Sequence, residues 1–126
     1  MVGVVVVSHS QDIARGVVDL AGQMAGGEVC LQSAGGDPYG TLGTDEGLVR
    51  DAIHRADQGD GVVVLADLGS AVLTIQHILE SGDGVVKLAD APVVEGTVAA
   101  AVVASMDLPL DDVVRAAEEA RHAHKR

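Results

Sequence analysis

The residues best suited to chemistry are a histidine near the start of the chain and an aspartate farther along it. His9 lies between Ser8 and Ser10, and Asp67 begins the sequence Asp-Leu-Gly-Ser that ends at Ser70. A histidine becomes a good nucleophile when one ring nitrogen donates its proton to a carboxylate, because the other nitrogen then keeps a free lone pair. The sequence therefore predicts that His9 carries a phosphoryl group and that Asp67 orients its ring.

Three further residues are candidates to hold the oxygens of that phosphoryl group: Ser10, Gly69 and Ser70. They lie where predicted strands meet the next helices, and the free backbone N–H groups at a helix N-terminus favour an anion. Gly69 would let the backbone approach closely, and the serines would supply hydroxyl groups. Because neither strand-end segment contains lysine or arginine, we expect the phosphate site to consist of neutral donors.

Each of the two main candidates also has a purely structural interpretation. A lone histidine is more often a structural or surface residue than a catalyst, and Asp67 could serve only as a helix N-cap, since Ser70 and an apolar stripe follow it. The pair His9 and Asp67 is a more specific signal than either residue alone. If the strand order is 2-1-3-4, both follow strands that are neighbours in the sheet, and they would face each other across one crevice at its carboxyl edge.

The elements that must position these residues are strands that alternate with helices. Runs rich in β-branched residues predict strands over 2–7, 28–32, 61–66 and 84–88. Helical spacing predicts helices over 12–25, 45–58, 70–80, 94–105 and 108–124. This alternation predicts an α/β fold: an open, mainly parallel four-stranded sheet flanked by helices, in a single domain over residues 1–126. The strand order that we expect is 2-1-3-4.

Several local signals define the ends and faces of these elements. In the first helix, an apolar stripe predicts the buried face: Ile13, Val17, Leu20, Ala21 and Met24. Thr44 is the expected N-cap of the second helix, residues 81–84 are expected to form a turn, and Pro109 is expected in the first turn of the last helix. The longest irregular segment is 33–44, and it lacks the Gly-Lys-Ser/Thr ending of a Walker-type phosphate loop.

The composition excludes several classes of function. The chain has 126 residues with 19 acidic and 8 basic side chains, and its net charge of -11 argues against nucleic acid as a partner. Tyr39 is the single aromatic residue, which removes the stacking surfaces of single-strand binders. The one cysteine, Cys30, is expected as a small buried residue, and no metal or cofactor is expected. Because no apolar run approaches the roughly 20 residues of a membrane helix, we expect no membrane partner and a cytoplasmic location.

Six motifs, in order along the chain, carry a family resemblance. They are Val7-Ser8-His9-Ser10, Gln23-Met24-Ala25, Ala34-Gly35-Gly36, Leu42-Gly43-Thr44, Asp67-Leu68-Gly69-Ser70-Ala71 and Ala91-Pro92-Val93-Val94-Glu95-Gly96. At this spacing the set resembles the phosphotransferase subunit of phosphoenolpyruvate-dependent dihydroxyacetone kinases, a relative of the mannose-family IIA domain of the sugar phosphotransferase system. The last two motifs are more similar to the dihydroxyacetone branch than to the mannose branch.

The resemblance implies a phosphohistidine relay, in which His9 forms a tele-phosphohistidine intermediate and Asp67 orients His9. A histidine-containing phosphocarrier protein would donate the phosphoryl group to His9, which would pass it to ADP bound on a nucleotide-binding kinase subunit. The ATP formed there would phosphorylate dihydroxyacetone that is held covalently on another kinase subunit. The resemblance also implies an open parallel α/β sheet and a homodimer.

Two other functions remain as alternatives. A sugar-transport IIA component of the mannose family would use the same phospho-His9 chemistry and would pass the group to a different acceptor. A non-catalytic α/β interaction module would only regulate a partner, and His9 would then be dispensable. Complementation with His9→Gln would test the interaction module, since that function does not need the histidine. Co-purification with a soluble kinase pair would support the kinase subunit, and co-purification with a membrane permease complex would support the transport component.

Overall fold

The computed structural model describes residues 1–82 and 84–126, and its centre is a parallel four-stranded sheet. The strand order is β2-β1-β3-β4, which confirms the predicted α/β fold and topology. The strands span Gly3–Ser8 (β1), Leu31–Gly35 (β2), Val62–Ala66 (β3) and Val86–Leu88 (β4). The helices span Gln11–Ala25 (α1), Glu46–Ala56 (α2), Gly69–Glu80 (α3), Val93–Ser105 (α4) and Leu110–Glu119 (α5), and a short 3₁₀ helix follows at Ala120–His122 (η1).

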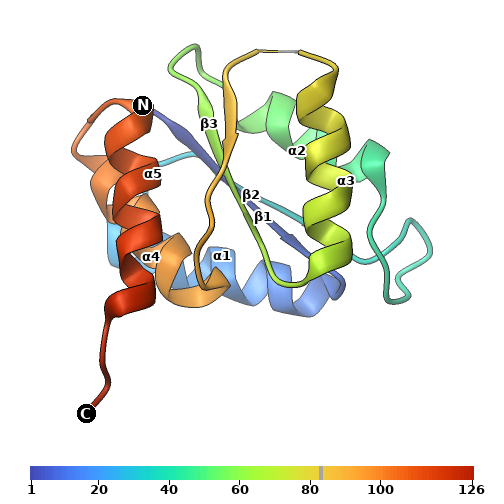
Figure 1. Ribbon diagram of the computed structural model, residues 1–126, viewed down its shortest axis with the longest axis horizontal. Helices are drawn as coiled ribbons and strands as arrows, with labels where there is room; N and C mark the ends of the chain where they lie inside the picture. Colours follow the sequence, from blue (N-terminus) through green and yellow to red (C-terminus); the bar gives the residue numbers. More distant parts are fainter. Residues whose placement is uncertain (83) are drawn as a thin grey trace.

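Helices cover both faces of the sheet (Figure 1). The helices α2 and α3 lie on one face, and α1, α4 and α5 lie on the other. Successive residues of β1 alternate between these faces, because Val5 and Val7 pack with α2 and α3, whereas Val4 and Val6 pack on the opposite side. A strand that is covered on both faces is apolar at every position, which explains the nearly continuous run of valines.

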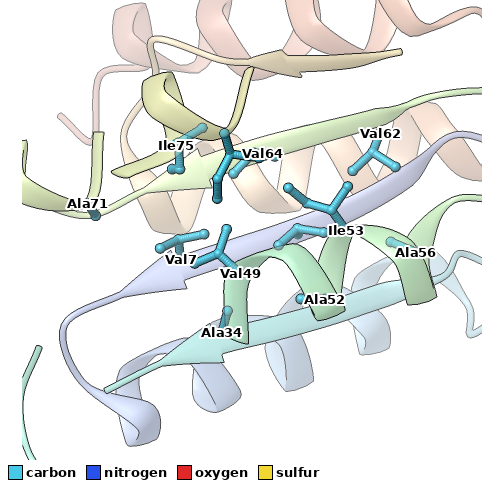
Figure 2. Close-up of a cluster of buried hydrophobic side chains, with 12 residues drawn as sticks. Val7, Ala34, Val49, Ala52, Ile53, Ala56, Val62, Val64, Ala71 and Ile75 are labelled. Atoms are coloured by element: carbon cyan, nitrogen blue, oxygen red, sulfur yellow. The ribbon is translucent and has the colours of Figure 1, made fainter. Parts of the chain in front are cut away.

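The core between the sheet and the α2–α3 pair contains only small and medium-sized side chains (Figure 2). Val62 and Val64 of β3 are buried there together with Ile53 of α2 and Ile75 of α3. The chain has no phenylalanine or tryptophan, so β-branched side chains and alanines fill this space. Small side chains let the helices pack close to the sheet.

The second strand is displaced from its predicted position. It begins at Leu31 and runs to Gly35, so it includes the first part of the segment 33–44 that the sequence predicts as irregular. The reason is that β2 is an edge strand, and its half-exposed Ser33 lacks the apolar pattern of a buried strand. Cys30, which precedes β2, is half-buried at the rim of the core rather than fully buried.

The helix ends differ from the sequence predictions in three places. Asp45, not Thr44, caps α2, and its carboxylate accepts a hydrogen bond from the Leu48 N–H at 2.9 Å. Pro109 is the N-cap residue of α5 rather than part of its first turn, because its backbone is extended. The helix α5 ends at Glu119, where the chain tightens into η1. The predicted turn 81–84 includes Asp83, which lies outside the described residues.

The buried face of α1 is narrower than the sequence predicts. Val17 and Ala21 are buried, whereas Ile13, Leu20 and Met24 are 50%, 43% and 60% exposed. The helix contacts the sheet on one side and α4 on another, and these close approaches admit small side chains more readily than large ones. None of the helices in the two described ranges is long and apolar enough to cross a membrane.

The end of β2 packs tightly against the start of α1. A Cβ atom on Gly35 would lie 2.5 Å from the Ser10 carbonyl oxygen and 2.7 Å from the Gln11 Cα. Both distances are far shorter than van der Waals contact, so only glycine fits at this position. The contact fixes the first turn of α1, which follows His9 directly.

Gly35→Ala should lower the free energy of unfolding by about 1–3 kcal/mol, because the added methyl group overlaps the backbone of α1. Gly16→Ala is the matched control, since a Cβ on Gly16 would meet none of the described atoms within 4 Å. Alanine at this exposed helical position should stabilise the protein by up to about 1 kcal/mol. Urea denaturation of both variants measures the difference, and a Gly35→Ala protein as stable as wild type would contradict the described packing.

Candidate active site

The pairing of β1 with β3 brings the two main candidate residues to the same edge of the sheet. Val7 lies opposite Ala66 in the parallel ladder, and the Asp67 N–H donates to the Val7 carbonyl oxygen at 3.2 Å. Asp67 therefore leaves β3 beside the point where His9 leaves β1. The topology thus places the carboxylate and the imidazole within reach of each other, although the two residues are distant in the sequence.

The Asp67 carboxylate holds His9 through both its ring and its backbone. His9 Nδ1 lies 3.1 Å from Asp67 Oδ1, and the His9 backbone N–H donates to Asp67 Oδ2 at 3.1 Å. Because an ionised carboxylate only accepts hydrogen bonds, Nδ1 carries the proton when the ring is neutral. The Nε2 atom then keeps its lone pair, and it is the ring nitrogen available for a covalent bond.

Hydrogen bonds keep Asp67 in its charged form. Burial raises the pKa of this carboxyl group, but the hydrogen bonds that it accepts from the Ser8 hydroxyl, the His9 N–H and ring, and the Leu68 N–H lower that pKa, and the net shift is downward. Each of these donors stabilises the carboxylate relative to the carboxylic acid. Asp67 is therefore an anion at neutral pH, and it can stabilise positive charge that develops on the imidazole.

The other ring nitrogen of His9 faces the start of α3. Nε2 is in hydrogen-bond contact with the Ser70 hydroxyl group, which donates when the ring proton is on Nδ1. Gly69 and Ser70 are the first two residues of α3, and both are exposed. A covalent group on Nε2 would therefore form beside a helix N-terminus.

The first turn of α3 has no side-chain cap among the described residues. Leu68, not Asp67, occupies the N-cap position, so the interpretation of Asp67 as the N-cap of α3 is wrong. A Cβ on Gly69 would meet none of the described atoms within 4 Å, so the space beside the Gly69 backbone is open. Backbone N–H groups that lack a capping side chain are ready donors for an anion.

Ser10 occupies the equivalent place at the start of α1. It is the N-cap residue, and its Oγ accepts a hydrogen bond from the Ile13 N–H at 3.3 Å. That bond uses a lone pair of the hydroxyl oxygen, so the hydroxyl hydrogen can still donate to another acceptor. Ser10 thus lies at the N-terminus of α1, and Gly69 and Ser70 lie at the N-terminus of α3. Both helices begin beside His9.

The segment that contains Gly43 also contacts the backbone of His9. Sequence reasoning does not identify this contact. The Gly43 N–H donates to the His9 carbonyl oxygen at 3.0 Å. The Asp37 carboxylate shapes this segment, since it accepts the N–H groups of Tyr39 and Thr41 at 2.9 Å each. The sequence Asp37-Pro38-Tyr39-Gly40 is typical of a turn, but no signal in the sequence shows which strand end the turn approaches.

A cavity of about 480 Å³ opens beside this site, between the start of α3 and the end of β4. Asp67, Leu68 and Gly69 line it on one side, and Leu88 and Asp90 line it on the other. Within 1–82 and 84–126, no group of three or more His, Cys, Asp or Glu side chains could hold a metal ion. The side chains of His9, Asp67 and Ser70, which meet beside this cavity, are suited to covalent chemistry on a nitrogen and to hydrogen bonding of an anion.

Asp67→Asn should destabilise the protein at neutral pH, and the deficit should shrink in acid. An asparagine amide points an N–H donor at groups that already donate to the carboxylate. Because the pKa of Asp67 in the folded protein lies below its ordinary value of 3.8, the carboxylate's stabilisation is complete above that value and is lost as the pH falls through the lowered pKa. Urea denaturation of both proteins from about pH 7 to about pH 2 measures this. A difference in stability that does not change with pH would contradict the described hydrogen bonds.

Comparison with known proteins identifies relatives along the whole length of the chain. Residues 3–114 match the EIIA-man family, described as the PTS system fructose IIA component. The chain is 39% identical to the phosphoryl donor subunit DhaM of the PEP-dependent dihydroxyacetone kinase of Escherichia coli K12, over 99% of this chain but only 28% of that protein. It is 38% identical to the phosphoryl donor subunit DhaM of PEP-dependent dihydroxyacetone kinase 1 of Listeria innocua, over 83% of both chains.

Solved structures share the fold. The crystal structure of EF1359, a protein of unknown function, superimposes with a TM-score of 0.83 and 33% identity over 94% of this chain and 93% of that one. The phosphotransferase system component EIIA from Streptococcus agalactiae superimposes with a TM-score of 0.72 over 97% of this chain and 93% of that one, and its 20% identity shows the fold alone. The chain belongs to the EIIA-man family, and it is a homologue of the phosphoryl donor subunits of PEP-dependent dihydroxyacetone kinases.

Proposed function

We propose that residues 1–126 form a phosphohistidine-carrying domain, which acts as the phosphoryl donor of a PEP-dependent dihydroxyacetone kinase. The observation that supports this most is the arrangement of the His9 ring. Its Nδ1 lies 3.1 Å from the Asp67 carboxylate, and its Nε2 faces the Ser70 hydroxyl at the start of α3. One nitrogen is thus held as a donor, and the other is directed to a place that favours an anion.

The proposed reaction consists of two phosphoryl transfers. In the first, Nε2 of His9 attacks the phosphorus carried by a histidine-containing phosphocarrier protein, the donor's N–P bond breaks, and a new N–P bond forms on His9. In the second, an oxygen of the ADP β-phosphate on a nucleotide-binding subunit attacks the same phosphorus, so that ATP forms and the Nε2 lone pair is restored. Asp67 stays an anion throughout and balances the positive charge of the phosphorylated ring.

Ser10, Gly69 and Ser70 are the residues that we propose to hold the phosphoryl oxygens. The uncapped first turn of α3 and the free hydroxyl hydrogen of Ser10 supply the donors. Ser70 contacts Nε2 in the unphosphorylated protein, so its hydroxyl would move from the nitrogen to a phosphoryl oxygen when the N–P bond forms. Catalysis of this kind depends on position and on stabilisation of charge rather than on proton transfer.

The surroundings of His9 are suited to protein partners. Leu68 and Leu42 are 62% and 78% exposed. Leu68 lines the cavity next to Asp67, and Leu42 precedes Gly43, whose N–H donates to the His9 carbonyl oxygen. Exposed leucines beside a reactive group favour contact with another protein. We propose the phosphocarrier protein and the ADP-binding and dihydroxyacetone-binding kinase subunits as partners, and a homodimer as the working form. The net charge of -11 suits partners with basic docking surfaces.

His9→Ala should abolish phosphorylation, because the variant lacks the accepting nitrogen. Incubation of the wild-type protein with phosphoenolpyruvate, enzyme I and the phosphocarrier protein should add one acid-labile phosphoryl group, which intact mass spectrometry detects. The control is His54→Ala, since His54 is an exposed histidine on α2 and away from the site. It should accept the group as wild type does. A phosphorylated His9→Ala protein, or an unmodified wild type, would refute the proposal.

The phosphorylated protein should pass its group to ADP on the kinase subunits rather than to a sugar permease. Mixing it with the purified ADP-binding and dihydroxyacetone-binding subunits and with dihydroxyacetone should consume the phosphohistidine and form dihydroxyacetone phosphate. The parallel assay uses membranes that contain a mannose-family permease and its sugar. Transfer to the sugar alone would favour the transport component, and transfer to neither acceptor would contradict both proposed relays.

A further inference from the structure

Ser8 is the residue at which the apolar strand β1 ends, and it is completely buried. Its exposed fraction is 0%, and Thr97 is the other buried polar residue in the described part of the chain. A buried hydroxyl group destabilises a protein unless both its hydrogen and its oxygen find partners. The Ser8 hydroxyl therefore has to be explained by its contacts.

The contacts of Ser8 define the direction of its hydrogen. Its Oγ lies 3.0 Å from the Ser10 N–H, which can only donate, and 2.7 Å from Asp67 Oδ2. The hydroxyl oxygen accepts the backbone hydrogen, so the hydroxyl hydrogen points to the carboxylate. Ser8 thus joins the backbone at the start of α1 to the carboxylate that follows β3.

This hydrogen bond occupies the half of the carboxylate that does not face the imidazole. Asp67 Oδ2 accepts from the Ser8 hydroxyl and the His9 N–H, while Oδ1 accepts from the Leu68 N–H and lies next to His9 Nδ1. With Oδ2 held by two donors, the carboxylate cannot rotate without breaking both bonds. Oδ1 is therefore kept in the direction of the ring.

From this geometry we infer that Ser8 is a positioning residue, which acts through Asp67 to set the orientation and the tautomer of His9. The expected effect of Ser8 on phosphoryl transfer rests on the proposed function of His9. The expected effect of Ser8 on the imidazole ring does not, because it exists in the unphosphorylated protein. Removal of the hydroxyl leaves Asp67 with one donor fewer and the Ser10 N–H without its acceptor. The carboxylate then gains freedom to turn, and the share of rings protonated on Nδ1 falls.

The groups around the Asp67 carboxylate allow a titration measured there to be assigned to Asp67. Among the donors to Asp67, His9 is the one titratable side chain, and the first turn of α3 holds no acidic residue. Across the adjoining cavity the other acidic lining residue is Asp90, which pairs with Arg121 at 3.3 Å. Ser8 is the strongest of the donors that lower the pKa of Asp67. Its loss should therefore move the titration of Asp67 to higher pH.

The experiment compares Ser8→Ala with Thr97→Val, which removes the other buried hydroxyl within α4. Nitrogen-15 and carbon-13 NMR of the unphosphorylated proteins report the His9 tautomer and the titration of the Asp67 carboxyl group. In Ser8→Ala the titration midpoint of Asp67 should rise, the share of Nδ1-protonated ring should fall, and the phosphorylation rate should fall by roughly tenfold or more. Thr97→Val should change none of the three.

A folded Ser8→Ala protein with an unchanged tautomer and an unchanged midpoint would overturn the inference, whatever its phosphorylation rate. If wild-type protein is never phosphorylated but the NMR shifts occur, the proposed function fails and the role of Ser8 stands. Should Ser8→Ala not fold, Ser8→Cys replaces it, since a thiol is a weaker donor than a hydroxyl group. Its Asp67 midpoint should lie above that of wild type, and an equal midpoint would overturn the inference.

Discussion

The parallel hydrogen-bond ladder between β1 and β3 is the constraint on which the rest of the site depends. It sets Val7 beside Ala66, and the chain leaves both strands at the same edge, into His9 and Asp67. A shift by one residue would turn every side chain of a strand to the other face of the sheet. Because β1 is apolar on both faces, the alternation of its side chains does not by itself select one register. The backbone ladder, continued by the hydrogen bond from the Asp67 N–H to the Val7 carbonyl oxygen, sets the position of the carboxylate relative to the imidazole.

Much of the fold could be predicted because the central strands are buried on both faces. Their unbroken valine runs and the alternation with helices are strong local signals for a parallel sheet, and the expected strand order is the one observed. The edge strand β2 extends beyond its predicted end because Ser33, which follows that end, resembles a loop residue in isolation. The exposed Ile13 and Met24 of α1 were misassigned for a related reason, since helical spacing identifies an apolar stripe but not its width in contact with the sheet.

The site was predictable to the extent that it depends on topology. His9 and Asp67 follow two central strands, so a general rule about the carboxyl edge of an open sheet brings them together. Contacts made by irregular segments could not be found in the same way. The support of His9 by Gly43, and the role of the Ser8 hydroxyl between Ser10 and Asp67, depend on distances of about 3 Å between backbone and side-chain atoms. Residue types and spacing carry no information at that scale.

The absence of lysine and arginine from the two strand-end segments that flank His9 has an energetic consequence for a carrier. Cationic donors bind a phosphoryl group much more strongly than neutral ones, and a strongly bound group would lower the free energy of the phosphorylated protein. The neutral hydroxyl and N–H donors proposed at Ser10 and Ser70 would stabilise the phosphoryl group less, and would leave a phosphohistidine with more of its phosphoryl transfer potential. In the proposed relay, the group can then pass to the next acceptor without first overcoming tight binding to the protein that carries it.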